Sequence, residues 1–240
     1  MQNNTKHQIN KKPLYITGGL LLVFYLVIIS IIYQEIKTSV IDQKLIDLKQ
    51  HLLFQESLRS YVDEELKPLV YRLQDEQILS KDYFDPHIVS GTFIARHVYQ
   101  NYAAKIAETN LTSWKYRLAA KTPRNPINQA TAKELELLAQ FNNDRTFKEL
   151  YTIEKINGKE TLFYAAPMQE TNGKCLRCHG DPSTSPAELV ERYGSINGFN
   201  EKLGEIRAFI SYRFDLTKSL ASAYNTVVKI SLLILILLGV

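Results

Sequence analysis

Cysteine is almost absent from this sequence of 240 residues, which contains only Cys175 and Cys178. A structural zinc site needs four ligands at set spacings, and no second Cys/His pair accompanies these two. A thioredoxin-like redox pair is expected within a βαβ unit, and the flanking pattern predicts none. The other possibilities for this pair are a structural disulfide and a spacing that arose by chance.

The motifs of several enzyme classes are missing as well. The sequence has no glycine-rich phosphate loop, no recognisable Ser/His/Asp set and no paired-carboxylate arrangement, and it has no internal repeat or low-complexity linker. The net charge of +4 is small for this length and gives no case for nucleic-acid binding. We therefore expect no catalytic activity in this segment itself.

Charge is missing from one long stretch, Leu14 to Tyr33. About 20 apolar residues span a bilayer as a helix, and no small-residue cleavage pattern follows, so residues 14–33 are predicted to be an uncleaved transmembrane anchor. The preceding basic residues Lys6, Lys11 and Lys12 indicate that residues 1–13 are cytoplasmic. The rest of the chain is then expected outside the cytoplasmic membrane of a bacterium.

A second apolar run ends the sequence, from Val227 to Val240, and it contains Lys229. The run is too short to span a bilayer by itself. We interpret residues 217–240 as a linker and the start of a second transmembrane helix, which implies a longer protein. The alternative is a hydrophobic tail that rests on the membrane.

The two cysteines stand in the motif Cys175-Leu176-Arg177-Cys178-His179. Two thiols about one helical turn apart can each form a thioether with one edge of a porphyrin, and a histidine directly after them can bind the iron. The motif therefore predicts covalently bound haem c, with His179 as proximal ligand. Covalent attachment of this kind agrees with a location outside the cytoplasm.

Two helical regions precede the motif. Residues 34–80 carry apolar residues three or four apart and predict an amphipathic stalk helix, kinked or divided at Pro68. Its apolar stripe fits either pairing with a second copy of the chain or packing on the chain's own sheet. A further helix is predicted from Pro86 to Lys105; it carries His87 and His97, and its small residues would suit either a flat ligand or ordinary helix packing.

The region 81–216 predicts an α+β fold with about four antiparallel strands. Strand patterns occur at 113–120, 150–156, 161–168 and 205–214, and Asn157-Gly158 between the second and third is a hairpin signal. Thr131 and Glu134 form a capping-box pattern before a helix. We expect helix on one face of this small sheet.

Several of these segments together resemble a known family. They are SYVDEELKP, the FDP turn with VSGTFIAR, YRLAAKTPRNPIN, CLRCHG and GEIRAFISYRF. The region from about Leu58 to Leu216 is similar to the PAS-like c-type haem sensor domains that bacterial histidine kinases, chemoreceptors and cyclases carry outside the membrane, and to free-standing cyanobacterial haem proteins. The resemblance implies a haem between the long helix and a PAS-like sheet, often within a dimer, and sensing of redox state or of a small diatomic ligand.

The resemblance also bears on individual residues. It assigns Cys175 and Cys178 to haem attachment and His179 to the iron. Some members take a sulfur ligand from the helix that corresponds to Pro86–Lys105, but this helix has no cysteine or methionine here. His97, His87 or an open, water-bound position are the alternatives, and Met168 is the only other soft ligand. For the haem propionates the candidates are Arg124, then Arg96 and Tyr116.

Three functions are weighed on this basis. The first is the extracytoplasmic haem sensor part of a membrane-anchored signalling protein, acting as a homodimer, with an output domain such as a kinase or cyclase beyond Val240. The second is a membrane-tethered cytochrome that exchanges electrons with a redox partner. A peroxidase-like enzyme would need an acid–base pair above an open iron, and only single histidines are present.

Overall fold

A computed structural model describes residues 12–237 of the chain. Lys6, Lys11 and residues 238–240, on which the predicted orientation and the second apolar run partly rest, lie outside the described residues. The chain forms two compact units, one of Leu45–Leu216 and one that contains the described residues on either side of it.

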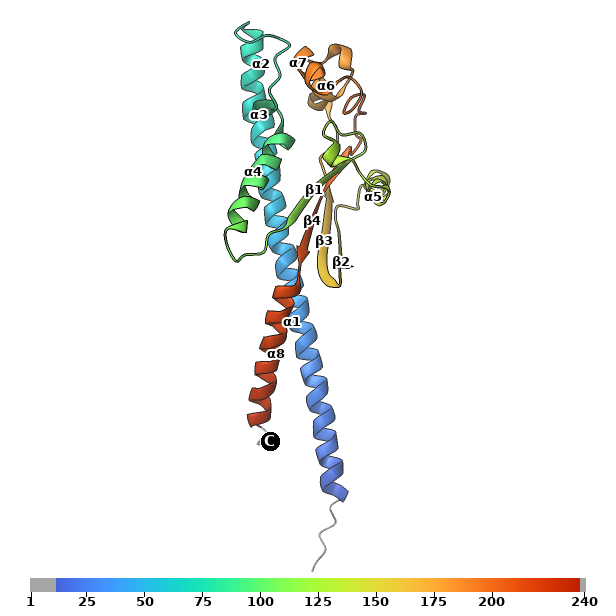
Figure 1. Ribbon diagram of the computed structural model, residues 1–240. Coiled ribbons are helices and arrows are strands. Elements are labelled where there is room, and N and C mark those ends of the chain that lie inside the picture. Colours follow the sequence, from blue (N-terminus) through green and yellow to red (C-terminus); the bar gives the residue numbers. More distant parts are fainter. Residues whose placement is uncertain (1–11, 238–240) are drawn as a thin grey trace, which may run out of the picture. The chain divides into compact units, whose positions relative to one another are not determined.

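The described elements are mostly helices, and the strands form one sheet (Figure 1). The helices are α1 (Lys12–Tyr61), α2 (Lys67–Asp75), α3 (Pro86–Val89), α4 (Gly91–Ala107), α5 (Ala132–Asn143), α6 (Gly173–His179), α7 (Ala187–Tyr193) and α8 (Thr217–Leu237). The strands are β1 (Lys115–Ala120), β2 (Leu150–Ile156), β3 (Lys159–Pro167) and β4 (Ala208–Asp215). The α+β class and the four antiparallel strands agree with the prediction.

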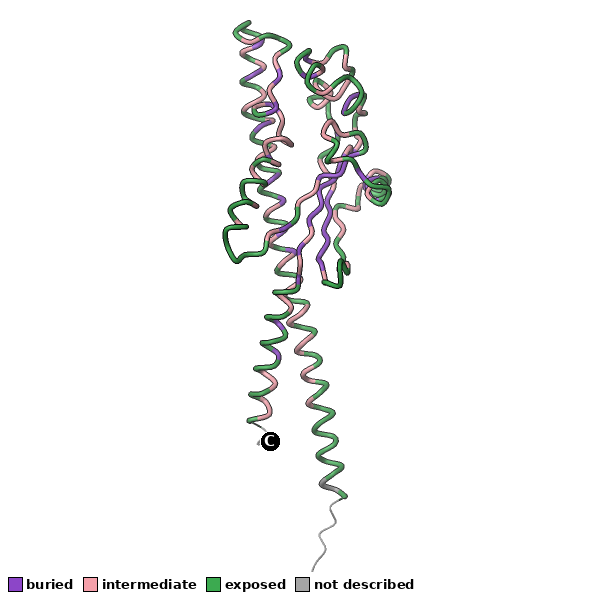
Figure 2. Tube along the Cα trace, in the orientation of Figure 1, coloured by how far each residue is buried: buried purple, intermediate pink, exposed green. Residues whose placement is uncertain are grey.

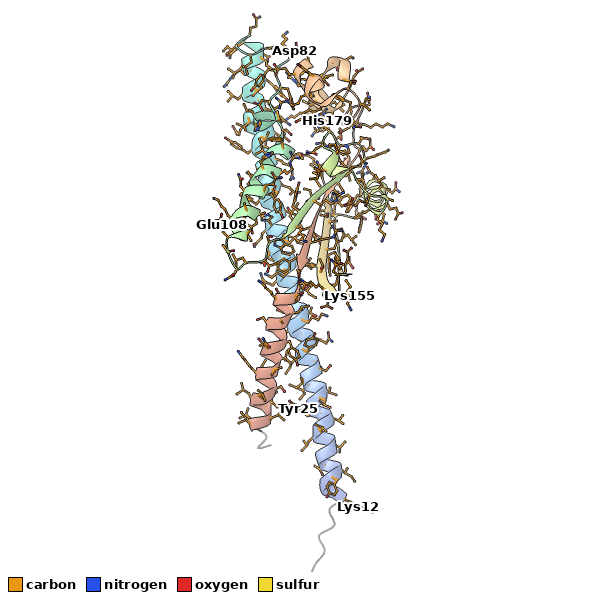
Figure 3. The ribbon with its side chains drawn as sticks, in the orientation of Figure 1. Lys12, Tyr25, Asp82, Glu108, Lys155 and His179 are labelled. Atoms are coloured by element: carbon orange, nitrogen blue, oxygen red, sulfur yellow. The ribbon has the colours of Figure 1, made fainter. Side chains whose placement is uncertain are left out.

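Two helical segments, Tyr15–Asp75 and Thr217–Leu237, are long and apolar enough to cross a membrane by length and composition. The second begins ten residues before the apolar run seen in the sequence, and it contains 21 residues. Within the unit that contains residues 12–44 and 217–237, the hydroxyls of Tyr25 and Ser231 form a hydrogen bond (Figure 3 labels Tyr25). Membrane insertion itself stays a prediction.

The predicted interruption near Pro68 takes a specific form. Between α1 and α2 lies a five-residue π-helix, Val62–Leu66, in which the Lys67 N–H donates to the Val62 carbonyl. Pro68 has no N–H, so the ordinary bond to the carbonyl four residues earlier is lost at this point. The wider π-helical turn keeps the helix continuous through the defect.

The single helix predicted from Pro86 to Lys105 is wrong in one respect, because the chain forms two helices there. Ser90 has an extended backbone (φ −110°, ψ 97°) and its hydroxyl accepts the Phe93 N–H at 3.3 Å, which caps α4. A Cβ on the following residue, Gly91, would lie 3.2 Å from Cα of Arg59. The small residues at this point therefore allow α4 to begin close against α1.

The sheet has the strand order β1-β4-β3-β2, with every neighbouring pair antiparallel. The hairpin predicted at Asn157-Gly158 is present between β2 and β3. Both turn residues have positive φ, 50° and 79°, which is the backbone that the two central residues of a type I′ turn require.

Helices cover both faces of this sheet, so the expectation of helix on one face only is wrong. On one face, Leu137, Leu138 and Phe141 of α5 pack in a buried cluster with Phe163 and Phe209. On the other face α1 lies against β4 and β1; the rings of His51 and Tyr212 are 5.9 Å apart, and Arg59 donates to the Tyr116 hydroxyl at 3.4 Å. Buried residues accordingly gather along the strands (Figure 2).

The start of α5 is fixed by the predicted capping box. Thr131 Oγ1 accepts the Glu134 N–H at 3.3 Å, and Glu134 Oε2 accepts the Thr131 N–H at 2.9 Å. Arg117 of β1 adds two bonds to the same carboxylate, at 2.6 and 2.9 Å. Burial raises the pKa of Glu134, but these hydrogen bonds outweigh it and leave the pKa below its usual value.

The first prediction concerns this carboxylate. Glu134→Gln should lower the free energy of unfolding by about 1–2 kcal/mol at pH 7, because the charge that pairs with Arg117 is lost, whereas glutamine can keep the capping-box bond to the Thr131 N–H. A depressed carboxyl pKa stabilises the fold above the pKa of the unfolded state, about 4.3. The difference between variant and wild type should therefore begin to shrink as pH falls below about 4.3, and it should be lost as pH falls through the lower pKa of the folded state. Urea unfolding of the full chain in detergent, followed by circular dichroism, measures both.

Glu136→Gln is the matched control, since Glu136 is exposed on the same helix. It should change the free energy of unfolding little at any pH. Equal effects of the two substitutions would contradict the assigned role of Glu134.

Candidate functional site

The two cysteines lie on the short helix α6. Asn172 caps this helix, and its side-chain oxygen accepts the backbone N–H of Lys174 at 2.9 Å and of Cys175 at 3.3 Å. Cys175 and Cys178 are three residues apart in α6, so their thiols lie on one side of the helix. Both are free thiols, and burial raises the pKa of the Cys178 thiol.

His179, which Figure 3 labels, is the last residue of α6, and contacts of one ring nitrogen orient its imidazole. Nδ1 lies 2.8 Å from the Gly198 carbonyl oxygen and 3.0 Å from Glu201 Oε1. Both partners are acceptors, so Nδ1 carries the proton and Nε2 the lone pair. Burial lowers the pKa of His179 despite its contact with Glu201, which favours the neutral imidazole that metal ligation requires.

The lone pair on Nε2 faces Arg207, whose Nη1 lies 2.5 Å away. Arg207 Nη1 also lies 3.4 Å from Glu201 Oε1, so the carboxylate contacts both side chains. A metal bound at Nε2 would take the place that the guanidinium holds here. Arg207 therefore has to move before this nitrogen can bind a metal.

Arg124, from the loop after β1, holds α6 and the loop around Gly198 together. Its Nη2 donates to the carbonyls of Cys178 and, at 2.9 Å, Gly198, and its guanidinium lies 4.5 Å from the centroid of the Phe199 ring. Burial lowers the pKa of Arg124 to about 10, which leaves it cationic at neutral pH. Its Nε is buried without a partner among the described residues.

Gly198 leaves the space that Arg124 occupies. It has φ +73°, and a Cβ there would lie 2.7 Å from Cγ of Arg124. The Gly198 carbonyl accepts from both Arg124 and His179. A side chain at this position would therefore disturb both contacts.

A second arginine joins α6 to α2. Arg177, the middle of the motif, lies 3.7 Å above the ring of Tyr71 and donates to Gln74 Oε1 at 2.7 Å. The Gln74 amide in turn donates to the carbonyls of Ser80 and Lys81. The motif is thus fixed on one side to α2 and on the other to the Gly198 loop.

A cavity of about 830 Å³ opens beside α6, within the range of small-molecule and cofactor sites. It is lined by Cys175, Cys178 and His179, by α1 and the π-helix, by α3 and α4, by the loop after β1 and by β4. Its walls include apolar residues such as Val89, Phe93 and Ile210 as well as several arginines.

The residues around this cavity fit the predicted haem. The two thiols and the imidazole come from one helix on one wall, and Arg96 and Arg124 supply cations on others. A bare metal ion would find few ligands, since no group of three or more His, Cys, Asp or Glu within residues 12–237 can hold one. Iron in a porphyrin needs only axial ligands from the protein.

The structure brings together some of the predicted site residues and separates others. Cys175, Cys178, His179, Arg96 and Arg124 line the cavity, and so does Met168. Tyr116, His87 and His97 are not among its lining residues.

The two helix histidines have other partners. The exposed His87 ring lies 2.7 Å from Asp85 Oδ1, and His97 Nδ1 lies 3.0 Å from the Phe93 carbonyl. Ser90 and Gly91 line the cavity, whereas Ala95 is fully buried. The small residues of this region thus differ in their surroundings, and whether a flat ligand lies against Ser90 and Gly91 stays a prediction.

Sequence reasoning missed Gly198, Glu201 and Arg207, which surround the His179 ring. From the sequence, Gly198 is only a glycine in a predicted loop. A glycine in a loop suggests a positive φ, which Gly198 has, but it does not predict a contact with His179. Nothing in the local sequence marks Glu201 or Arg207, because their contacts with His179 depend on the tertiary fold.

Comparison with known proteins gives two matches. Residues 37–214 match the family model described as Tll0287-like. Among solved structures, the crystal structure of the cyanobacterial heme-protein Tll0287 is similar over 72% of this chain and 95% of that chain, with 20% sequence identity and a TM-score of 0.48. No curated protein matches. Since the family model covers well over half of the sequence, the chain belongs to the Tll0287-like family.

Proposed function

We propose that this chain binds haem, attached covalently as haem c through Cys175 and Cys178, with His179 as an axial ligand of the iron. The observation that carries the proposal is that both thiols and the imidazole line one cavity of about 830 Å³. Membership of the Tll0287-like family supports it further, because Tll0287 itself is a cyanobacterial heme-protein.

The chain's own residues would each have a defined task. Gly198 and Glu201 hold the His179 ring through Nδ1 and leave Nε2 for the iron. Arg207 would leave Nε2 and keep its ion pair with Glu201, or turn toward a propionate. Arg96 and Arg124 line the cavity and would offer donors for propionates. Haem c would supply an iron that changes charge on reduction and can take a diatomic ligand.

We infer that this haem domain is the sensory input of a membrane-anchored protein. Residues 14–33 and the apolar end of the chain would be the anchors, with residues 81–216 on the outer side of the cytoplasmic membrane. The cavity wall includes Glu56 and Arg59 of α1, the same helix that begins at Lys12. A bound state that prefers one position of this helix over another can pass a signal.

The rival function is a membrane-tethered electron-transfer cytochrome. It requires an iron with both axial positions closed by the protein. Neither histidine of α3 and α4 is among the cavity-lining residues, and Met168 is the one thioether there. Without either histidine, the second ligand of the iron would be Met168 or a water molecule; we propose water, because a gas sensor needs a ligand that leaves readily.

A homodimer is proposed through the outer face of α1. Leu48 and Leu52 are buried, whereas Ile46, Leu53 and Phe54 are 50–61% exposed. These residues recur at helical spacing on the side of α1 that the sheet does not cover. A second copy of the same helix offers a matching apolar stripe, and isologous pairing of this kind is the commonest assembly.

The attachment is tested by Cys175→Ala combined with Cys178→Ala, in protein produced with the haem-attachment machinery. Covalent pigment should disappear, because no thioether can form; haem staining after denaturing electrophoresis measures this. Each single substitution should leave one thioether, and its pyridine haemochrome spectrum should be shifted relative to that of the wild type. Ser183→Ala, an exposed residue just beyond the motif, is the control and should keep full pigment. Pigment that survives denaturation in the double variant would exclude this attachment.

The second axial position is tested by adding carbon monoxide to the reduced protein. We expect a rapid change in the absorption spectrum, because no side chain has to leave the iron. His87→Gln and His97→Gln should behave like the wild type. A wild type that stays inert, with Met168→Leu becoming reactive, would identify Met168 as a ligand and favour electron transfer.

The dimer is tested with Leu53→Glu combined with Phe54→Glu. Two charges on the outer face of α1 should convert a dimer in detergent to monomers, measured by sedimentation velocity, without loss of pigment. The exposed pair Glu64→Gln and Glu65→Gln in the adjacent π-helix is the control. A wild type that sediments as a monomer at all concentrations would contradict the proposal.

A further inference from the structure

Between α1 and the sheet lies a layer of polar side chains, of which Arg59 alone also lines the cavity of the proposed haem site. His51, Gln55 and Arg59 are four residues apart on α1 and so form one stripe along it. Across from them, Tyr116, Tyr212 and Tyr164 are cross-strand neighbours on β1, β4 and β3, and therefore lie on the same face of the sheet. We call these six residues the polar layer.

Several polar atoms of this layer are buried without a partner among the described residues. They are His51 Nε2, Gln55 Oε1, Arg59 Nε and the Tyr212 hydroxyl. Gln55 is 1% exposed and Tyr212 is fully buried. Buried polar groups in proteins are nearly always hydrogen-bonded to protein or to ordered water, so four such atoms in one layer indicate bound water.

His51 is the one side chain of the layer that can gain a proton near neutral pH. Its ring is surrounded by aromatic rings, with centroids 6.4 Å from Tyr99, 5.0 Å from Tyr102 and 5.9 Å from Tyr212. Burial lowers the pKa of His51, and no charged group contributes to that shift.

Among the described residues, none of the charged groups around the layer forms an ion pair with His51. On the α1 side, Arg59 reaches the Tyr116 hydroxyl. On the β3 side, Glu149 accepts from Tyr164 at 2.9 Å and pairs with Lys49 at 2.6 Å. Glu56 acts on Tyr164 and Tyr212, where it raises the pKa of each phenol, and not on His51. Protonation of His51 would therefore place a cation on a half-buried ring whose Nε2 is shielded from solvent, among phenols and with another cation further along its own helix.

We propose that the polar layer is a proton-binding site: neutral His51 keeps this part of α1 docked on the tyrosines through buried water, and protonation of His51 releases it. The imidazole gains one proton from bulk solvent, and Nε2 of the resulting cation, which is buried in the docked state, is hydrated only when the layer opens. The proposal concerns acid sensing by the domain and does not depend on haem.

The direction of the effect follows from linkage. The open state, with a solvated imidazole of ordinary pKa about 6.5, binds more protons than the docked state. Docking is thus unaffected well above pH 6.5 and weakens as pH falls below it. One proton limits the change to about tenfold in the opening equilibrium per pH unit.

Hydrogen exchange of the full-length holoprotein in nanodiscs tests this. Protection factors, corrected for the intrinsic pH dependence of exchange, are compared between pH 7.5 and pH 5.5 for amides of residues 48–59. We expect them to fall severalfold in the wild type and to stay level in His51→Gln, which keeps hydrogen bonding but does not titrate. Amides of α5, on the opposite face of the sheet, report on global unfolding and should change less.

His51→Phe keeps an aromatic ring and provides a second non-titrating variant if the glutamine substitution disturbs the fold. His97→Gln removes an exposed histidine of the same unit and should retain the wild-type pH dependence. The proposal is overturned if residues 48–59 keep their protection at pH 5.5, if the His51 variants lose it as the wild type does, or if α5 loses protection by the same factor.

Discussion

The position of His179 depends on two backbone carbonyls that Arg124 holds. The guanidinium donates to the carbonyl of Cys178 at the end of α6 and to that of Gly198 in a loop further along the chain. The Gly198 carbonyl then accepts from His179, so one loop arginine sets the distance between the cysteine motif and the group that orients its histidine. Because Arg124 is buried and cationic, this contact is charge-assisted, and such bonds are stronger than neutral ones.

The sequence predicted those parts of the molecule that local chemistry determines. The Asn157-Gly158 hairpin and the Thr131 capping box depend on a few consecutive residues, and both are present. Near Pro68, where the sequence predicts a kinked or divided helix, the chain instead stays helical through a π-helix. The motif itself is local as well, since the two thiols and the imidazole share one short helix. Their arrangement on one cavity wall follows from that helix.

The parts that could not be predicted depend on tertiary contacts. The division of the predicted helix at Ser90 occurs where Gly91 approaches Arg59 of α1 closely, and no pattern in the local sequence predicts that approach. The Phe141 side of α5 packs on the face of the sheet away from α1, whereas strand alternation alone does not tell which face a helix will cover. Likewise, Glu201 and Arg207 meet His179 only because the loop around Gly198 folds back onto α6.

The π-helix Val62–Leu66 has a consequence for how α1 and α2 are related. A turn closed between residues five apart holds an additional residue compared with an α-helical turn, so the stripe that faces the sheet along α1 does not continue straight into α2. Leu48 and Leu52 of α1 are buried. Val70 of α2 is buried in a separate cluster that contains Phe84 and Leu189. One continuous helical segment can thus present apolar surfaces in two directions. Adding a residue to the π-helix, or removing one, would rotate the apolar surface of α2 about the helix axis relative to that of α1.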